Sequence, residues 1–229
     1  MSAPTASLTL LANTRVSNGW RLLRLDWPHP APAPGQWLEL RAAGQVVRLP
    51  VSHASSRENW LALVAPPPLA SALADWAPQS RLEVDGPRGP ALQPCAEPPV
   101  LLAADAGIPA ALFFVETAPV KPRLALLGGR LPPPFRPVPT QFMLAGLPPE
   151  AIAAAPMLEA QAVPSRLAQA EDRPGCFEGS VVELLQLWLA SQPPTPLDLL
   201  ACLPEAEADA LTALALAAGH RLRIVPALA

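Results

Sequence analysis

The pattern of hydrophobic residues changes near residues 90–98, and this change limits the folds open to the chain. Before it, short runs alternate apolar and polar residues with a period of two, which is typical of antiparallel strands with one buried face. After it, continuous apolar runs alternate with helical segments, which is typical of buried parallel strands. The sequence therefore predicts two domains, residues 1–93 and residues 97–229.

The first part of the chain predicts a small barrel. Turn signals rich in glycine, proline and asparagine separate the apolar runs, and one short helix is expected over residues 69–76. Six short antiparallel strands at this spacing favour a closed barrel over an open sheet. The expected strands are residues 7–11, 20–27, 36–41, 46–52, 60–64 and 81–84.

The second part predicts a doubly wound parallel α/β sheet. Helices are expected over residues 110–117, 179–190 and 205–218. Strands are expected over residues 100–103, 123–127, 141–145, 158–163, 197–201 and 220–225. The fold class is thus β + α/β, a six-stranded antiparallel β-barrel followed by a doubly wound parallel sheet.

Composition excludes several classes of function. The chain has 229 residues, a net charge of −3 and no run of Lys or Arg, so we expect no nucleic-acid partner. No charge-free and proline-free apolar window reaches the length of about 20 residues that a membrane span needs. Its start lacks a signal-peptide pattern, and Cys95, Cys176 and Cys202 form no disulfide framework, so we expect a cytoplasmic location. No metal site is expected.

Several short motifs resemble those of the ferredoxin–NADP reductase-like superfamily. The nearest likeness is to the electron-transfer subunit of dihydroorotate dehydrogenase. The motifs are Gly35–Leu40 (GQWLEL), Arg48–Ser52 (RLPVS), Gly86–Gly89 (GPRG), Leu101–Pro109 (LLAADAGIP), Gly128–Arg130 (GGR) and Cys202–Pro204 (CLP). The resemblance implies a flavin-binding-type barrel, a nucleotide-binding-type α/β domain and two cofactors that carry out the redox chemistry.

The resemblance also implies where cofactors would bind. FAD, with FMN as the other choice, would lie along Arg48, Pro50, Val51 and Ser52, and its diphosphate would pass Gly86 and Gly89. A nicotinamide nucleotide would lie at Gly107, Gly129 and Arg130, with Cys202 near the site of hydride transfer. We expect no iron–sulfur cluster, because the chain ends at Ala229 without the cysteines that such a cluster needs.

Four positions depart from the family pattern. Leu49 replaces the arginine directly before the proline, and Arg48 points to the opposite face of the strand. Ala104 and Asp105 replace the two glycines of the turn, so a carboxylate would face phosphate oxygens. Leu203 replaces the glycine that follows the cysteine. These changes argue against NAD(P)H binding.

Each candidate residue also has a purely structural explanation. Ser52 would be an ordinary strand-end serine, and Cys202 a small buried hydrophobic residue. Asp105 would cap the helix that begins near Gly107 with proline in its first turn. His53 would face solvent, because the sequence shows no carboxylate partner for it.

Two hypotheses about function follow. The first is a flavin-dependent oxidoreductase that moves electrons between NAD(P)H, or a redox partner protein, and an acceptor. The alternative is a non-catalytic scaffold that has lost nicotinamide binding, with or without loss of flavin binding, and that acts through a partner. Leu49, Ala104, Asp105 and Leu203 motivate the alternative, because each alters a different cofactor contact.

Overall fold

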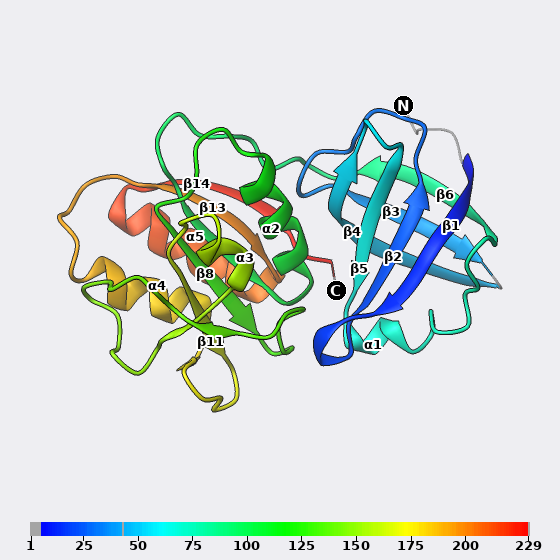
Figure 1. Ribbon diagram of the computed structural model, residues 1–229. Coiled ribbons are helices and arrows are strands. Elements are labelled where there is room, and N and C mark those ends of the chain that lie inside the picture. The colour runs from blue at the N-terminus through cyan, green and yellow to red at the C-terminus, as the bar shows by residue number, and fades with distance from the viewer. Residues whose placement is uncertain (1–5, 43, 229) are drawn as a thin grey trace.

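The computed structural model describes residues 6–42 and 44–228 and contains a barrel beside a parallel sheet (Figure 1). Six antiparallel strands close the barrel in the order β1-β2-β5-β4-β3-β6, and six strands form the sheet in the order β12-β11-β8-β7-β13-β14. This confirms the predicted fold class. The boundaries at residues 93 and 97 stay a prediction.

The barrel strands follow the predicted order along the chain. They are β1 (Ala6–Arg15), β2 (Arg21–Asp26), β3 (Trp37–Ala42), β4 (Gln45–Ser55), β5 (Trp60–Ala65) and β6 (Arg81–Arg88). A 3₁₀ turn, η1 (Ser17–Gly19), joins β1 to β2. The helix expected over residues 69–76 is shorter than predicted: α1 spans Pro67–Ala70, and turns follow it.

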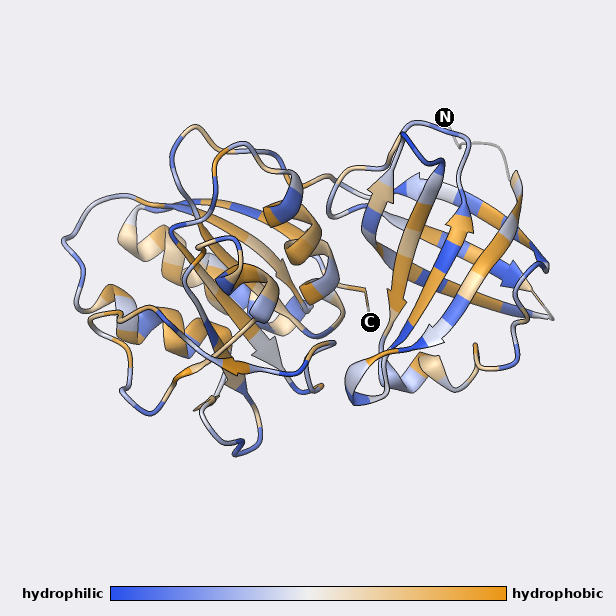
Figure 2. Ribbon diagram, in the orientation of Figure 1, coloured by the Kyte–Doolittle hydropathy of each residue, from blue (hydrophilic) through white to orange (hydrophobic). Residues whose placement is uncertain are grey.

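Alternating side chains fill the barrel. Apolar and polar residues alternate along its strands (Figure 2), so one side of each strand turns toward a common core. Leu23 and Leu25 of β2, with Leu38 and Leu40 of β3, are fully buried in that core. Burial of such side chains, worth about 1.5–3 kcal/mol each, is the main force that closes the barrel.

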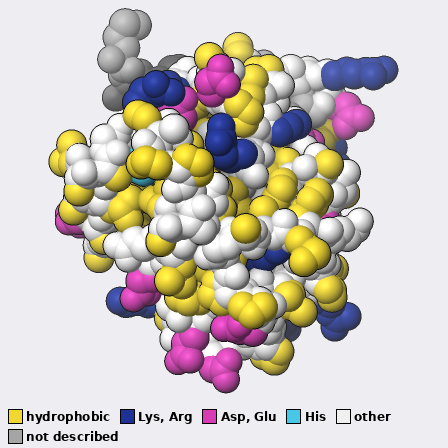
Figure 3. Space-filling model, turned by 90° about the vertical axis from the view of Figure 1, so that its left-hand side faces the viewer, with side chains coloured by type: hydrophobic (Ala, Val, Ile, Leu, Met, Phe, Trp, Pro, Cys, Tyr) yellow, Lys and Arg dark blue, Asp and Glu magenta, His cyan; other side chains and the backbone are white. Residues whose placement is uncertain are grey.

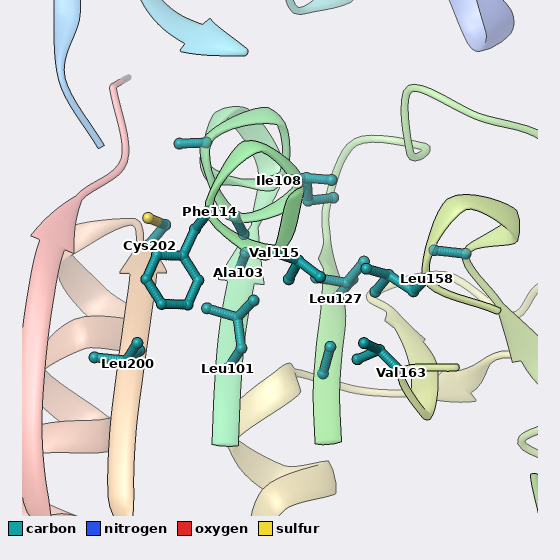
Figure 4. Packing of buried hydrophobic residues seen from close by; sticks show 14 of the residues in the cluster. Leu101, Ala103, Ile108, Phe114, Val115, Leu127, Leu158, Val163, Leu200 and Cys202 are labelled. Carbon is teal, nitrogen blue, oxygen red and sulfur yellow. The ribbon is translucent and has the colours of Figure 1, made fainter. Parts of the chain in front are cut away.

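The second sheet is parallel and covered on both faces. Its strands are β7 (Val100–Ala104), β8 (Leu124–Gly129), β11 (Ser165–Gln169), β12 (Phe177–Glu178), β13 (Asp198–Leu203) and β14 (Arg221–Pro226). Helices α2 (Ile108–Thr117) and α3 (Pro156–Glu159) contribute to the core on one face, and α4 (Val181–Leu189) and α5 (Glu205–Ala218) to the core on the other. In the first core Phe114 of α2 lies over Leu101 and Leu200 (Figure 4).

Two predicted strands of this sheet are wrong. Residues 141–145 form a loop, and residues 158–163 contain the end of α3 and a turn closed by a bond from Val163 N to Leu158 O. The third parallel strand is β11, which the sequence analysis missed because Ser165, Arg166 and Gln169 are polar yet buried. A further two-stranded ribbon pairs β9 (Val138–Pro139) with β10 (Ala153–Ala154).

Helix α2 lies between the two halves (Figure 1). Its Phe114 packs into the sheet core, whereas the neighbouring Phe113 packs into the barrel core beside β4. Hydrogen bonds outside α2 also join the two halves: Trp20 Nε1 donates to Pro132 O at 2.7 Å, and Asn18 Nδ2 donates to Pro133 O at 2.7 Å. The helix that follows β7 therefore belongs to both cores.

The face of the α/β unit remote from the barrel carries many hydrophobic side chains between scattered charges (Figure 3). Leu216 on α5 is 79% exposed and Leu187 on α4 is 44% exposed. Among the described residues, no helix has the length and apolar character needed to cross a membrane.

Candidate functional site

A crevice opens where the parallel strands end. The chain runs outward from β7 through β8 to β11 and then returns to β13 on the other side of β7. Sheets of this kind bind ligands at such a switch point, outside the carboxyl ends of the strands. The crevice here has a volume of about 660 Å³, and residues from β13, β14, α5 and the barrel helix α1 line it. Its polar lining side chains are Asp105, Arg130 and Glu205.

Asp105 occupies the turn between β7 and α2. Its backbone is left-handed, with φ +49°, and its Oδ1 accepts a hydrogen bond of 2.7 Å from Leu131 N. A Cβ at Gly129 would lie 2.5 Å from the same oxygen, so the carboxylate fills the space over the end of β8. The predicted cap is therefore wrong: α2 has no side-chain cap, and Asp105 holds the next loop instead. The predicted proline in the first turn of α2 is confirmed.

Two carboxyl groups at the start of α5 lie near this turn. Glu205 and Glu207 lie in the first turn of α5. Burial, followed by the charge of Asp105, raises the pKa of the Glu207 carboxyl, and Arg130 opposes that change. Oε2 of Glu207 is buried and has no hydrogen-bond partner among the described residues. Two of the three polar side chains that line the crevice, Asp105 and Glu205, are therefore carboxylates.

Gly107 and Cys202 form the tight contact between α2 and β13. A Cβ at Gly107 would lie 2.1 Å from Cys202 O, so only glycine fits there. Cys202 is 1% exposed, and burial raises the pKa of its thiol to about 12. Leu203 is fully buried. Cys202 thus has the surroundings of a structural, neutral thiol, which agrees with its interpretation as a small buried hydrophobic residue.

The four candidate flavin residues of β4 are divided between the two faces of the strand. The Arg48 side chain is 62% exposed, and its Nε donates to Glu39 Oε2 at 3.0 Å. Pro50 and Val51 are buried, as is Leu49 in the barrel core. Ser52 Oγ donates to Ala62 O at 3.0 Å. Arg48 therefore points away from Leu49, as predicted, and already has an ionic partner.

Gly86 and Gly89 accommodate side chains of the neighbouring strand β3. Their φ values are +129° and +85°, a region that favours glycine. A Cβ at Gly86 would lie 2.8 Å from Leu38 Cδ2, and one at Gly89 would lie 2.8 Å from Trp37 Nε1. Packing of the barrel is thus sufficient to require both glycines.

No family model matches the chain, and no curated protein matches it. Solved structures do. The ferredoxin reductase in carbazole 1,9a-dioxygenase aligns at a TM-score of 0.70 and 15% identity, over 99% of this chain and 70% of that one. A ferredoxin NADP⁺ reductase from Neisseria gonorrhoeae, solved with bound FAD and NADP, gives 0.68 and 14%, over 99% and 100%. The FAD/NAD-binding domain of nitric oxide dioxygenase from Vibrio cholerae gives 0.68 and 13%, over 96% and 98%.

The chain has the ferredoxin reductase fold. The resemblance seen in its short motifs is thereby confirmed at the level of architecture. In this chain the crevice lies at the edge of the sheet where Asp105 and Arg130 are found.

The start of helix α1 is a part of the crevice that the sequence did not indicate. Helix α1 begins beside the crevice with Pro66 as N-cap, followed by Pro67 and Pro68. A helix start usually offers several free N–H groups to an anion, but proline has none. The N–H groups of Leu69 and Ala70 both donate to Pro66 O. Pro66, Pro67 and Pro68 therefore offer no backbone donor on this side of the crevice, and these three consecutive prolines were visible in the sequence.

A contact between the two halves corrects the expectation for His53. Its Nδ1 lies 2.5 Å from Glu116 Oε2 on α2, and its ring stacks on Trp60 with centroids 5.0 Å apart. Phe113 lies on the same ring at 5.9 Å. The carboxylate partner was invisible in the sequence because it is on a different domain. His53 thus helps to hold α2 on the barrel.

Proposed function

We propose that this chain is a binding protein built on the ferredoxin reductase fold, whose crevice no longer takes a dinucleotide phosphate. The position of the Asp105 carboxylate carries this proposal. It lies over the end of β8, against Gly129 and bonded to Leu131 N. A phosphate placed there would meet a like charge, at a cost on the order of 1 kcal/mol or more in a partly desolvated site.

The barrel side supports the same conclusion. Arg48 is paired with Glu39. Leu49, which stands where the family motif has a second arginine, is buried in the barrel core. On the other wall of the crevice, the prolines at the start of α1 have no N–H group to donate to a phosphate. The residues present therefore do not fit the diphosphate of FAD or the pyrophosphate of NAD(P)H.

What remains is an apolar crevice with an acidic rim. Leu69, Leu131, Leu203 and Ile224 are among its apolar lining residues, and its volume is about 660 Å³. Pockets of this size and lining bind apolar molecules or side chains of a partner. We therefore propose that the crevice receives an uncharged, apolar group, in a cytoplasmic protein whose two domains span residues 1–93 and 97–229.

A flavin-dependent electron-transfer protein is the second candidate. The fold favours it, because the Neisseria gonorrhoeae reductase, which has the same fold, was solved with bound FAD and NADP. FAD, or FMN in its place, would then lie along Arg48–Ser52 and past Gly86 and Gly89, and a redox partner protein or NAD(P)H would supply electrons. The remaining family contacts would come from Gly107, Gly129, Arg130 and Cys202. Neither candidate includes an iron–sulfur cluster.

The absorption spectrum of the freshly purified full chain separates the two candidates. We expect a colourless protein that gives no saturable calorimetric signal with FAD, FMN, NADH or NADPH at about 1 mM, corresponding to binding weaker than about 4 kcal/mol. The Neisseria gonorrhoeae reductase is the positive control. Flavin absorbance, or tight binding of either nicotinamide nucleotide, would overturn the first candidate.

Binding in the crevice has its own test. The neutral dye Nile red should gain fluorescence with the wild-type chain and lose most of that gain with Ala208→Trp, because Ala208 lines the crevice. Ala206→Trp is the matched control, since Ala206 is exposed on the same helix and is not among the lining residues. Equal fluorescence from both variants would contradict the proposal.

A further inference from the structure

A second pocket, separate from the crevice, lies between β11 and the loop of residues 140–152. Its volume is about 600 Å³, and it shares no lining residue with the crevice. Phe142, Leu144, Leu147 and Ile152 give it apolar walls. Arg166, near the start of β11, is the cation that lines it.

Arg166 is a buried charge with incomplete bonding. It is 4% exposed, and its Nη1 and Nη2 donate to the carbonyls of Ser165 and Phe142 at 2.7 Å and 2.6 Å. These bonds use two of the five N–H groups of the guanidinium. Nε is buried without a partner, and among the described residues no carboxylate lies within 4.0 Å of Arg166.

The surroundings of Arg166 do not supply the missing negative charge. Burial lowers the pKa of its guanidinium, and the charge of Glu159 opposes that change from a distance. The Glu159 oxygens are already engaged, because they accept hydrogen bonds of 2.9 Å from Thr140 Oγ1 and from Gln141 N. A buried charge without a close counterion is strongly unfavourable, so a ligand anion would relieve it.

We propose that this pocket binds the carboxylate of a ligand with an apolar chain, and that Arg166 anchors it. A carboxylate is planar and has two acceptor oxygens, which matches the N–H groups that a guanidinium presents in one plane. A single cation with Glu159 nearby favours a monoanion over a doubly charged phosphate. The apolar walls then contact the chain of the ligand.

Octanoate is the probe, titrated into the full-length protein by calorimetry. We expect saturable binding that Arg166→Met weakens at least about tenfold, the change that corresponds to 1.4 kcal/mol. Arg136→Met is the matched control, because Arg136 is exposed and does not line the pocket. 1-Octanol, which has the chain without the charge, should bind more weakly than octanoate.

Two variants at the pocket wall test the sign of the charge without removing Arg166. Ile152 is 47% exposed and therefore tolerates a polar side chain. Ile152→Glu should weaken octanoate binding several-fold, and Ile152→Lys should strengthen it. The absence of saturable octanoate binding by the wild-type protein would overturn the proposal. So would equal affinity across the Ile152 variants, or equal affinity for octanoate and 1-octanol, and Arg166 would then only fasten the loop.

Discussion

At the scale of single residues, Gly129 and Asp105 share one small space. Gly129 has φ +118°, and a Cβ there would meet Asp105 Oδ1 at 2.5 Å. We expect Gly129→Ala to destabilise the protein by about 2–4 kcal/mol, from backbone strain and overpacking together. Urea unfolding measures the loss.

The control for this substitution is Gly44→Ala. Gly44 also has a positive φ, +76°, but no atom of the described residues lies within 4 Å of its missing Cβ, so only strain of about 1 kcal/mol is expected. In an Asp105→Gly background, Gly129→Ala should cost less than in the wild type. Equal costs in both backgrounds would show that the carboxylate does not occupy this space.

Asp198 makes a pH-dependent contribution to the stability of the folded protein. Hydrogen bonds from Arg221, at 2.7 Å and 2.9 Å, hold the pKa of Asp198 below its ordinary value. Its stabilisation is full above the unfolded pKa of about 3.9 and is lost as pH falls through the lower folded pKa. Because the Arg221 side chain is 64% exposed, water screens the pair and limits the gain to about 1 kcal/mol.

We therefore expect Asp198→Asn to be about 1 kcal/mol less stable than the wild type at pH 7, with the difference disappearing in strong acid. Urea unfolding at both pH values measures it. Asp209→Asn, at an exposed position of α5, should leave the stability unchanged at either pH. A difference that grows as the pH falls would contradict this assignment.

At the scale of elements, the start of α4 depends on a capping box. Ser180 Oγ accepts from Glu183 N at 3.1 Å, and Glu183 Oε2 accepts from Ser180 N at 2.7 Å. Ser180→Ala should cost about 1 kcal/mol in thermal unfolding, whereas Ser180→Thr keeps the hydroxyl and should cost less. Equal losses would mean that the hydroxyl does not cap α4.

Elements with regular hydrophobic patterns could be predicted from sequence, and the exceptions have physical causes. Strand β11 was missed because it carries buried polar side chains, and a distant partner such as Ala155 N, which donates to Ser165 Oγ, is invisible in the sequence. The altered positions Leu49 and Asp105 were visible in the sequence. Their consequences were not, because the bond from Leu131 N and the contact between His53 and Glu116 join segments far apart in the chain.

At the scale of the whole molecule, α2 couples the barrel to the sheet. Phe113 and Phe114 are 3% and 1% exposed, and they pack into different cores. Both Phe→Ala changes should cost about 3–5 kcal/mol. Only Phe113→Ala should separate the unfolding of the two halves, because only Phe113 packs against the barrel.

Scanning calorimetry measures the number of unfolding transitions, and we expect two for Phe113→Ala and one for Phe114→Ala. Tryptophan fluorescence assigns them, since five of the six tryptophans precede residue 77 and report on the barrel. A single shared transition in Phe113→Ala would show that other contacts, such as the bond from Trp20 Nε1 to Pro132 O, are enough to couple the halves.

Because α2 is attached to two cores, the fold of the molecule and the chemistry of its crevice depend on different residues. Its first residues adjoin the turn at Asp105, but the helix is secured by two hydrophobic cores that do not include Asp105. Replacements in the turn can therefore accumulate and change what the molecule is able to hold, while its architecture survives them intact.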